Sequence, residues 1–168
     1  MGEPELTADL SSEQAFTELA ARCSRALLAA RCWPLVVGLR GDLGSGKTTW
    51  ARAMLRGLGY RGRVPSPTYT LLEQYACDGL TVVHLDLYRL RGEAELENLG
   101  LRDWLADDRC WLVVEWPERA PQLAARCDLK LEFALIAPAG RRLVANAGTH
   151  LGIEALSSIR HGAFNYRA

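Results

Sequence analysis

Residues 41–48, Gly-Asp-Leu-Gly-Ser-Gly-Lys-Thr, match the phosphate-loop pattern G-x-x-x-x-G-K-S/T at every fixed position. Glycines let successive backbone N–H groups point inward around an anion, and a following helix adds unpaired amides at the positive end of its dipole. In such loops the lysine, here Lys47, serves the β- and γ-phosphates, and the hydroxyl, here Thr48, is the usual magnesium ligand. The motif therefore predicts a site for the phosphate chain of a nucleotide.

This loop needs a strand before it and a helix after it. Residues 34–39, Pro-Leu-Val-Val-Gly-Leu, have the composition of a buried strand, and residues 49–58 have apolar side chains at helical spacing, ended by Gly59. The order of strand, loop and helix favours a phosphate loop over a simple glycine-rich turn.

Two acidic residues are candidates for the carboxylate that holds magnesium or orients the attacking water. Asp86 ends the apolar run 82–85, and Glu115 ends the apolar run 111–114. Each is therefore expected at the carboxyl edge of a sheet, where ligand sites of α/β proteins gather. The alternatives are a turn-starting role for Asp86 and a solvent-facing position for Glu115, and the spacing does not decide which is the inner-sphere magnesium ligand.

Other side chains have a functional and a plain interpretation. Residues 66–69, Ser-Pro-Thr-Tyr, are either a switch that senses the γ-phosphate or a turn before a strand. Trp116 is either a lid over the site or a packing residue, which is the commoner role of tryptophan. Four arginines either surround the phosphates or are solvated: Arg61, Arg63, Arg89 and Arg91.

Length and charge limit the classes of protein. A chain of 168 residues with 49% apolar residues suits a single domain, residues 1–168, with a layered core. Twenty basic and twenty acidic residues cancel, so no overall charge favours DNA, RNA or a membrane surface, and any RNA contact has to be local or supplied by a partner. The acidic N-terminus lacks an apolar signal core and no apolar run reaches membrane-span length, so we expect a cytoplasmic protein.

The cysteines and histidines do not predict a zinc site. The five cysteines are odd in number and form no C-x-x-C pair, which is typical of reduced, half-buried packing residues in the cytoplasm. The three histidines are too scattered for a zinc site: His84, His150 and His161.

The rest of the chain alternates helical and extended segments. Ser11 or Ser12 caps a helix that runs to about Ala30, with Gln14 as a capping-box partner. The Asp78-Gly79 step predicts an antiparallel hairpin, and hence a mixed sheet. The other expected segments are a loop beside the phosphates (59–67), the hairpin strands (69–76, 80–86), two short helices (92–100, 101–107), a central strand (110–115), a helix that contains or is interrupted by Pro121 (117–126), a second hairpin (128–135, 141–145) and a last helix (153–160).

Several blocks together resemble the bacterial TsaE (YjeE) family, the small ATPase of tRNA threonylcarbamoyladenosine synthesis. The resemblance covers about residues 11–145. The blocks are the loop at 41–49, Val-Pro-Ser-Pro-Thr-Tyr-Thr at 64–70, His-Leu-Asp-Leu-Tyr-Arg-Leu at 84–90, Glu95 with Leu99-Gly100, and Val-Glu-Trp-Pro at 114–117.

The resemblance implies a P-loop NTPase-like α/β fold, with a mixed β-sheet sandwiched between helices and an antiparallel hairpin after the P-loop helix. Its core covers about 11–147, with a C-terminal helix and tail at 150–168. It implies ATP with Mg²⁺, and slow hydrolysis that depends on TsaD, which transfers the threonylcarbamoyl group to tRNA, and on TsaB. The ATPase does not itself modify tRNA.

The resemblance also implies roles for matched residues. Lys47, Asp86 and Glu115 would serve catalysis, and Thr48, Glu115 and Asp86 the metal. Residues at the nucleotide would be Ser12 near the base, Leu43, Gly44, Ser45, Gly46, Lys47, Thr48 and Thr49 in the loop, Ser66 and Thr68 in the switch, and Trp116. Trp50 stands where Phe is common, and no motif matches beyond about Thr149.

Two other functions share the loop. A small-metabolite kinase would need an arginine-bearing lid, for which only residues 89–91 are available. A nucleotide-dependent binding switch with negligible catalysis overlaps with a slow ATPase. A GTPase is disfavoured because the N-K-x-D guanine motif is absent.

Overall fold

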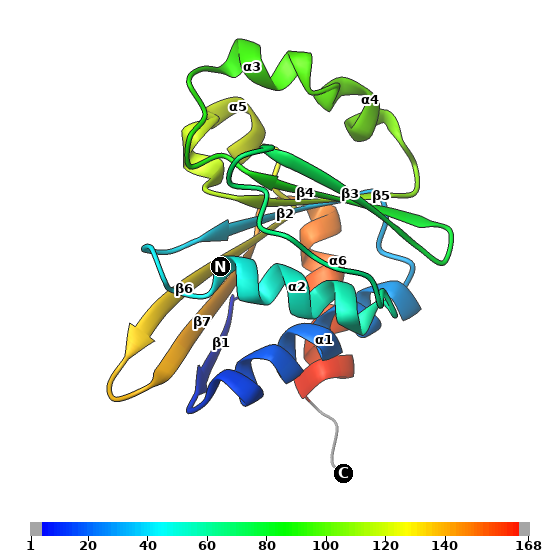
Figure 1. Cartoon of the computed structure of the whole chain (residues 1–168). Coiled ribbons are helices and arrows are strands. Elements are labelled where there is room, and N and C mark those ends of the chain that lie inside the picture. Colours follow the sequence, from blue (N-terminus) through cyan, green and yellow to red (C-terminus); the bar gives the residue numbers. More distant parts are fainter. Residues whose placement is uncertain (1–4, 165–168) are drawn as a thin grey trace.

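Seven strands form one mixed sheet in the order β1-β7-β6-β2-β5-β4-β3 (Figure 1). The computed structural model describes residues 5–164. Strands β6, β2, β5 and β4 run parallel to their neighbours in this order, whereas β1–β7, β7–β6 and β4–β3 are antiparallel pairs. The strands are β1 (Glu5–Leu10), β2 (Leu35–Arg40), β3 (Leu72–Cys77), β4 (Leu80–Asp86), β5 (Cys110–Glu115), β6 (Leu129–Ile136) and β7 (Gly140–Ala147).

Helices cover both faces of this sheet (Figure 1). One face carries α1 (Glu13–Ala29), α2 (Lys47–Gly57) and α6 (His150–Ile159), and the other carries α3 (Glu93–Asn98), α4 (Leu101–Ala106) and α5 (Pro121–Ala124). The expected mixed sheet between helices is thus confirmed, including the antiparallel hairpin β3–β4 after the loop helix.

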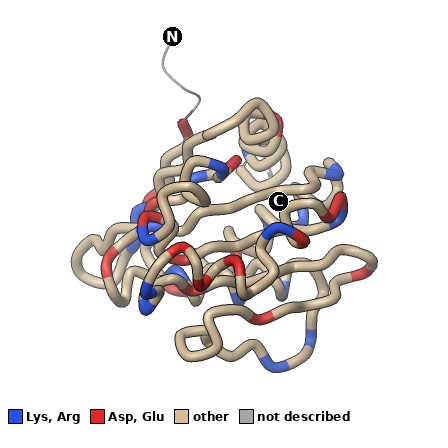
Figure 2. Tube along the Cα trace, turned by 90° about the horizontal axis from the view of Figure 1, so that it is seen from above, with Lys and Arg blue, Asp and Glu red and all other residues tan. Residues whose placement is uncertain are grey.

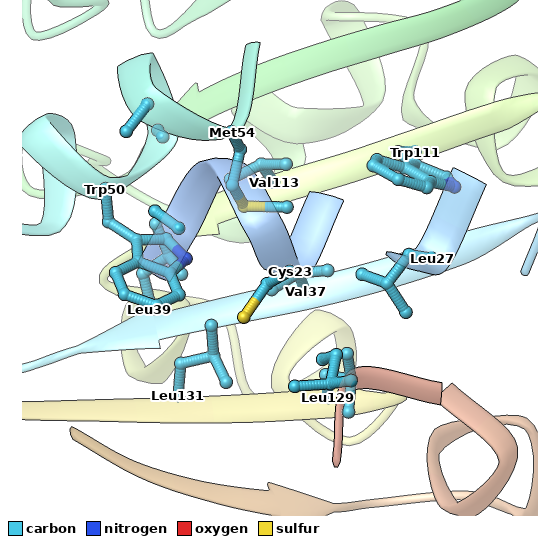
Figure 3. Packing of buried hydrophobic residues seen from close by; sticks show 14 of the residues in the cluster. Cys23, Leu27, Val37, Leu39, Trp50, Met54, Trp111, Val113, Leu129 and Leu131 are labelled. Carbon is cyan, nitrogen blue, oxygen red and sulfur yellow. The ribbon is translucent and has the colours of Figure 1, made fainter. Parts of the chain in front are cut away.

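The larger core lies between the sheet and helices α1, α2 and α6. Cys23 of α1 and Met54 of α2 point toward Val37 of β2 and Val113 of β5 (Figure 3). Val36, the neighbour of Val37, belongs to a second core on the opposite face. Because β2 is buried on both faces, its sequence is almost continuously apolar rather than alternating.

The second core is smaller and lies beneath α3, α4 and α5. Val83 and Leu85 of β4 and Val114 of β5 pack there against Leu96 of α3. Both β4 and β5 are therefore anchored on two faces. Their last residues, the two candidate acids, are brought to one edge of the sheet in a defined register.

Two helix starts agree with side-chain capping. The Ser12 hydroxyl accepts a hydrogen bond from the Ala15 amide at 3.1 Å, as expected for the first helix. The last helix was expected at 153–160 but begins at His150, because the Thr149 hydroxyl caps it by accepting from the Gly152 amide at 3.1 Å.

Three other boundaries were wrong. The loop helix begins at Lys47 rather than at residue 49, and the first hairpin strand begins at Leu72, because residues 67–70 form a turn. The expected helix 117–126 is divided into a 3₁₀ turn (Pro117–Arg119) and α5. Pro121 causes this division, since a proline lacks the N–H that would continue the first turn but is well suited to start a helix.

The sequence interpretation missed β1. It is an edge strand that pairs with β7, with Leu6 opposite Ala145 and buried, while its neighbours Glu5 and Thr7 are exposed. Polar residues at an edge give only a short alternating signal. In the tail, residues 160–164 form a π-helical turn next to α1, and residues 165–168 lie outside the described part of the chain.

The distribution of charged residues and the burial of the cysteines can be compared with the expectations from composition. Basic and acidic residues are interspersed along the chain (Figure 2). All five cysteines are free and fully buried, not half-buried as expected, and burial raises the pKa of the Cys23 thiol to about 12. In the range 5–164, no helix is both long and apolar enough to cross a bilayer.

Candidate nucleotide-binding site

A pocket of about 370 Å³ opens at the carboxyl edge of β2, β5 and β4. A larger hollow of about 770 Å³ lies among α3, α4 and α5, but it contains no residue of the loop 41–48. The smaller pocket is therefore the relevant one. It is lined by Leu43, Gly44, Gly46, Lys47, Thr48, Thr49, Thr68, Asp86, Tyr88, Arg89, Glu115, Trp116 and Arg141.

The loop geometry requires glycine immediately before α2. Gly46 has a φ of 108°, a left-handed conformation that other residues rarely adopt. A Cβ there would also lie 2.9 Å from Arg141 Nε and 2.9 Å from Phe16 Cε1. No side chain caps α2, so its first amides remain available to an anion in the pocket.

Lys47 is a buried residue of the pocket lining. Its ammonium donates to the carbonyl oxygens of Gly41 and Asp42, and it lies 3.9 Å from the centroid of the Trp116 ring. Burial lowers the pKa of Lys47, while the carboxylates nearby, Glu115 foremost, oppose that shift. A phosphate group would replace the two neutral acceptors by a charged one.

Trp116 lines the site and also packs, partly buried, against the second core. Its backbone is left-handed, with a φ of 57°, and turns the chain directly after Glu115. The indole lies against both Lys47 and the Tyr88 ring, whose centroid is 5.0 Å away. It thus forms a wall of the pocket.

Glu115 is held at the end of β5 by hydrogen bonds with two side chains. The Thr48 hydroxyl lies 2.8 Å from Oε1 and 2.9 Å from Oε2, and His84 Nε2 lies 2.7 Å from Oε1. The Glu115 side chain is 3% exposed and that of His84 is 1% exposed. A buried carboxylate with this many partners has a fixed orientation toward the loop.

Asp86 lies beside Glu115 because the two residues are paired across β4 and β5. Its Oδ2 accepts from the Thr68 hydroxyl at 3.0 Å, and its Oδ1 accepts from the Tyr88 amide at 3.0 Å. Asp86 therefore starts a turn and also lies in the site, although sequence alone left these two roles as alternatives. Ser66 reaches this group only through Thr68, at 2.8 Å between the two hydroxyl oxygens.

The oxygen atoms at this end of the pocket fit a magnesium ion. Thr48, Glu115 and Asp86 supply a hydroxyl and two carboxylates, which are hard ligands of the kind that Mg²⁺ prefers. Across residues 5–164, neither carboxylate forms an ion pair with a lysine or arginine. Glu115, and not Asp86, contacts the Thr48 hydroxyl directly.

Three of the sequence-derived candidates lie outside the pocket lining: Ser12, Ser45 and Ser66. Ser12 uses its hydroxyl to cap α1, although its neighbour Glu13 contacts Arg141 of the pocket. The Ser45 side chain is buried in the loop, and only its backbone oxygen contacts Arg141.

No residue of the loop 59–67 lines the pocket, and only its end lies beside the site, where Ser66 contacts Thr68. The loop follows α2, where Arg52 Nε donates to the Val64 carbonyl at 3.0 Å. Of the four arginines in question, Arg89 lines the pocket and lies 4.6 Å from the centroid of the Tyr69 ring. Arg61, Arg63 and Arg91 are not among the lining residues.

Sequence reasoning missed three residues of the site. His84 precedes Asp86 by two positions in a strand, and this period of two was a usable signal that both residues share a face. Tyr88 belongs to the block 84–90 but received no role. Arg141 follows a hairpin turn far from any motif, and no local pattern identifies it.

A phosphate loop between a buried parallel strand and a helix, at the carboxyl edge of the sheet, defines the P-loop class of folds. A family model described as threonylcarbamoyl adenosine biosynthesis protein TsaE matches residues 10–143. The chain therefore belongs to the TsaE family.

Individual relatives agree with this assignment. TsaE of Haemophilus influenzae is 41% identical over 124 residues, which are 74% of this chain and 77% of that protein. TsaE of Aquifex aeolicus is 33% identical over 129 residues, or 76% and 85% of the two chains, and the match to TsaE of Synechocystis spans 59% of that relative. Both long matches carry the printed name tRNA threonylcarbamoyladenosine biosynthesis protein.

The fold also matches a solved structure. The crystal structure of Bacillus subtilis YdiB aligns with a TM-score of 0.73 and covers 96% of this chain and 97% of that one. The sequence identity in this alignment is 21%, so the likeness concerns the fold alone.

Proposed function

We propose that this protein binds ATP with Mg²⁺ and hydrolyses it slowly, as the ATPase that supports threonylcarbamoylation of the adenosine next to the anticodon in tRNA. Its partners would be the TsaD and TsaB proteins, in the cytoplasm. Membership of the TsaE family supports the pathway. The contact between the Glu115 carboxylate and the Thr48 hydroxyl, beside Lys47, carries the proposal of hydrolysis.

Each part of the pocket has a role in this reaction. The loop amides and Lys47 would bind the phosphates and stabilise the charge that develops on the γ-phosphoryl group. When bound, Mg²⁺ would supply further positive charge next to the phosphate chain. Thr48 and Glu115 would hold this ion, and Asp86 with Thr68 would orient the attacking water.

The rim of the pocket supports a rate that depends on partners. Leu43 is 66% exposed and Tyr69 is 82% exposed, and both lie at or beside the pocket. Large apolar side chains at an open rim are typical of a surface that a protein partner covers. We expect the TsaD–TsaB pair to exclude bulk water there and to raise the rate.

Charge supports an indirect role toward tRNA. Lysine plus arginine and aspartate plus glutamate are equal in number, at 20 each. A protein that bound the phosphate backbone on its own would need a basic surface. Contact with tRNA is therefore assigned to the assembled complex.

The test is magnesium-dependent ATP hydrolysis by the purified protein, alone and with TsaD, TsaB and tRNA, with Lys47→Ala as the blank. Strong stimulation by the pair is the expected result. Turnover that appeared only with a small-metabolite acceptor would instead establish the kinase. ATP-dependent assembly without turnover would establish a binding switch.

A further inference from the structure

Arg141 is a half-buried basic residue on the side of the pocket opposite to Glu115. It stands at the start of β7, directly after the hairpin from β6. Its side chain is 14% exposed and lines the pocket together with Gly46 and Thr49. Since burial of a guanidinium is costly without charged or hydrogen-bonding partners, its position requires an explanation.

The contacts of Arg141 fix its guanidinium against the outside of the loop. Its Nε donates to the Ser45 carbonyl at 3.2 Å, and the guanidinium carbon lies 5.0 Å from the centroid of the Phe16 ring. Its Nη2 is 3.5 Å from the carboxylate of Glu13, which is itself 69% exposed. A guanidinium has five N–H donors, so these contacts leave donors for a ligand in the pocket.

The sheet order places Arg141 at a particular end of a phosphate chain. Strands β6 and β7 lie on one side of β2, while β5 and β4, with Glu115 and Asp86, lie on the other. In a phosphate loop the lysine and hydroxyl mark the γ-phosphate and metal end. Glu115 and Asp86 stand at that end, so the nucleoside end lies on the other side of β2, where Arg141 lines the pocket with Thr49.

A neighbouring groove supports this direction. It has a volume of about 600 Å³, lies between α1 and α2, and is lined by Glu13, Gln14 and Thr49 among others. Thr49 lines both the groove and the phosphate pocket. The Arg141–Glu13 pair thus stands where the two spaces meet.

We propose that Arg141 is a nucleotide-binding residue, whose guanidinium donates hydrogen bonds to the α-phosphate of the bound nucleotide. This inference rests on the proposed ATP site. A charge-assisted hydrogen bond to phosphate is stronger than the present contact with a neutral carbonyl. The Arg141 contact therefore stabilises ATP and ADP alike, because both nucleotides carry the α-phosphate.

The test compares affinities for Mg·ADP and Mg·ATP by calorimetry in the wild type and in Arg141→Met. Methionine keeps an apolar stem over Phe16 but removes every donor. We expect both affinities to fall by the same factor, about tenfold or more. Arg142→Met is the matched control and should leave both affinities unchanged. Arg142 is exposed and does not line the pocket, and its Nε lies 2.7 Å from the Asp9 carboxylate.

Other outcomes overturn the inference in distinct ways. If Arg141→Met binds ADP as tightly as the wild type, Arg141 does not contact the α-phosphate. If only the ATP affinity falls, the contact of Arg141 is with the γ-phosphate instead. If Arg141→Met does not fold, Arg141→Lys retains the charge, and an equal but smaller loss for both nucleotides is expected. Failure of the wild type to bind either nucleotide would refute the proposed function itself.

Discussion

The pocket has two walls of opposite charge, and they are built differently. The acidic wall, Glu115 and Asp86, stands at the ends of two central strands that are covered on both faces. The basic wall, Lys47 and Arg141, consists of long side chains anchored on backbone carbonyls of the loop. Glu115 is 3% exposed, whereas Arg141 is 14% exposed and pairs with an open surface residue.

This difference separates two tasks. The register of β4 and β5 sets the positions of the carboxylates, and buried hydrogen bonds orient them, so they are arranged before any ligand enters. Preorganised groups of this kind contribute mainly to the chemical step. In the proposed ATP site the cations would exchange their carbonyl partners for phosphate oxygens, so we expect Arg141 to contribute mainly to binding and Lys47 to both binding and hydrolysis. Variants of the two walls should separate hydrolysis from affinity.

The largest effect is expected for Glu115→Gln on the acidic wall. The amide keeps the size of the side chain but loses the charge that would hold the metal. Single-turnover hydrolysis should fall by about 10²–10³-fold, while affinity for ATP changes by less than about threefold. Equal hydrolysis by the variant and the wild type would remove Glu115 from the mechanism.

The next effect is expected for His84→Leu, behind the same wall. Loss of the contact at 2.7 Å removes one of the two partners of Glu115 Oε1 in a buried position, and the free energy of unfolding should fall by about 1–3 kcal/mol. Hydrolysis should fall about tenfold and require more Mg²⁺, with nucleotide affinity retained. His84→Gln offers a replacement donor as control, and if it restores neither magnesium dependence nor rate, His84 serves packing only.

A smaller effect is expected for Thr68→Val. This isosteric change removes the donor to Asp86 Oδ2 but keeps the shape of the turn. One neutral hydrogen bond of this kind is worth about 1 kcal/mol, so we expect an approximately fivefold loss in hydrolysis. Ser66→Ala is the control, since Ser66 contacts Thr68 and not Asp86. If both variants have the same rate as the wild type, the switch role of this segment is refuted.

The smallest effect is expected for Trp116→Leu on the basic side. The indole lies 3.9 Å from the Lys47 ammonium, and a cation–π contact of this type contributes about 0.5–1 kcal/mol. ATP affinity should fall about two- to fivefold in equilibrium titration. Trp33→Leu is a suitable control, because Trp33 contacts Arg109 away from the pocket. If ATP affinity is unchanged in Trp116→Leu, the indole lines the pocket without contributing to nucleotide binding.

Local patterns predicted the parts of the site that are contiguous in sequence. The phosphate loop, the apolar strands that end at Asp86 and Glu115, and the Asp78-Gly79 hairpin follow from residue type and spacing alone. The edge strand β1 and the start of α6 were missed or misplaced, because their stability depends on β7 and on a single capping hydroxyl. The sequence pattern of a short edge strand or of one capping residue is weak unless the strand or helix that it contacts is already known.

The sequence by itself determined the class of fold, the loop and the two candidate acids, since each depends on neighbours a few residues apart. Only the tertiary structure decided that His84 orients Glu115, that Trp116 is a wall of the site, and that Arg141 reaches the loop from β7. The physical reason is distance along the chain: Arg141 and Ser45 are 96 residues apart. Their contact exists because strand order brings the β6–β7 hairpin beside β2, and no local pattern contains that order.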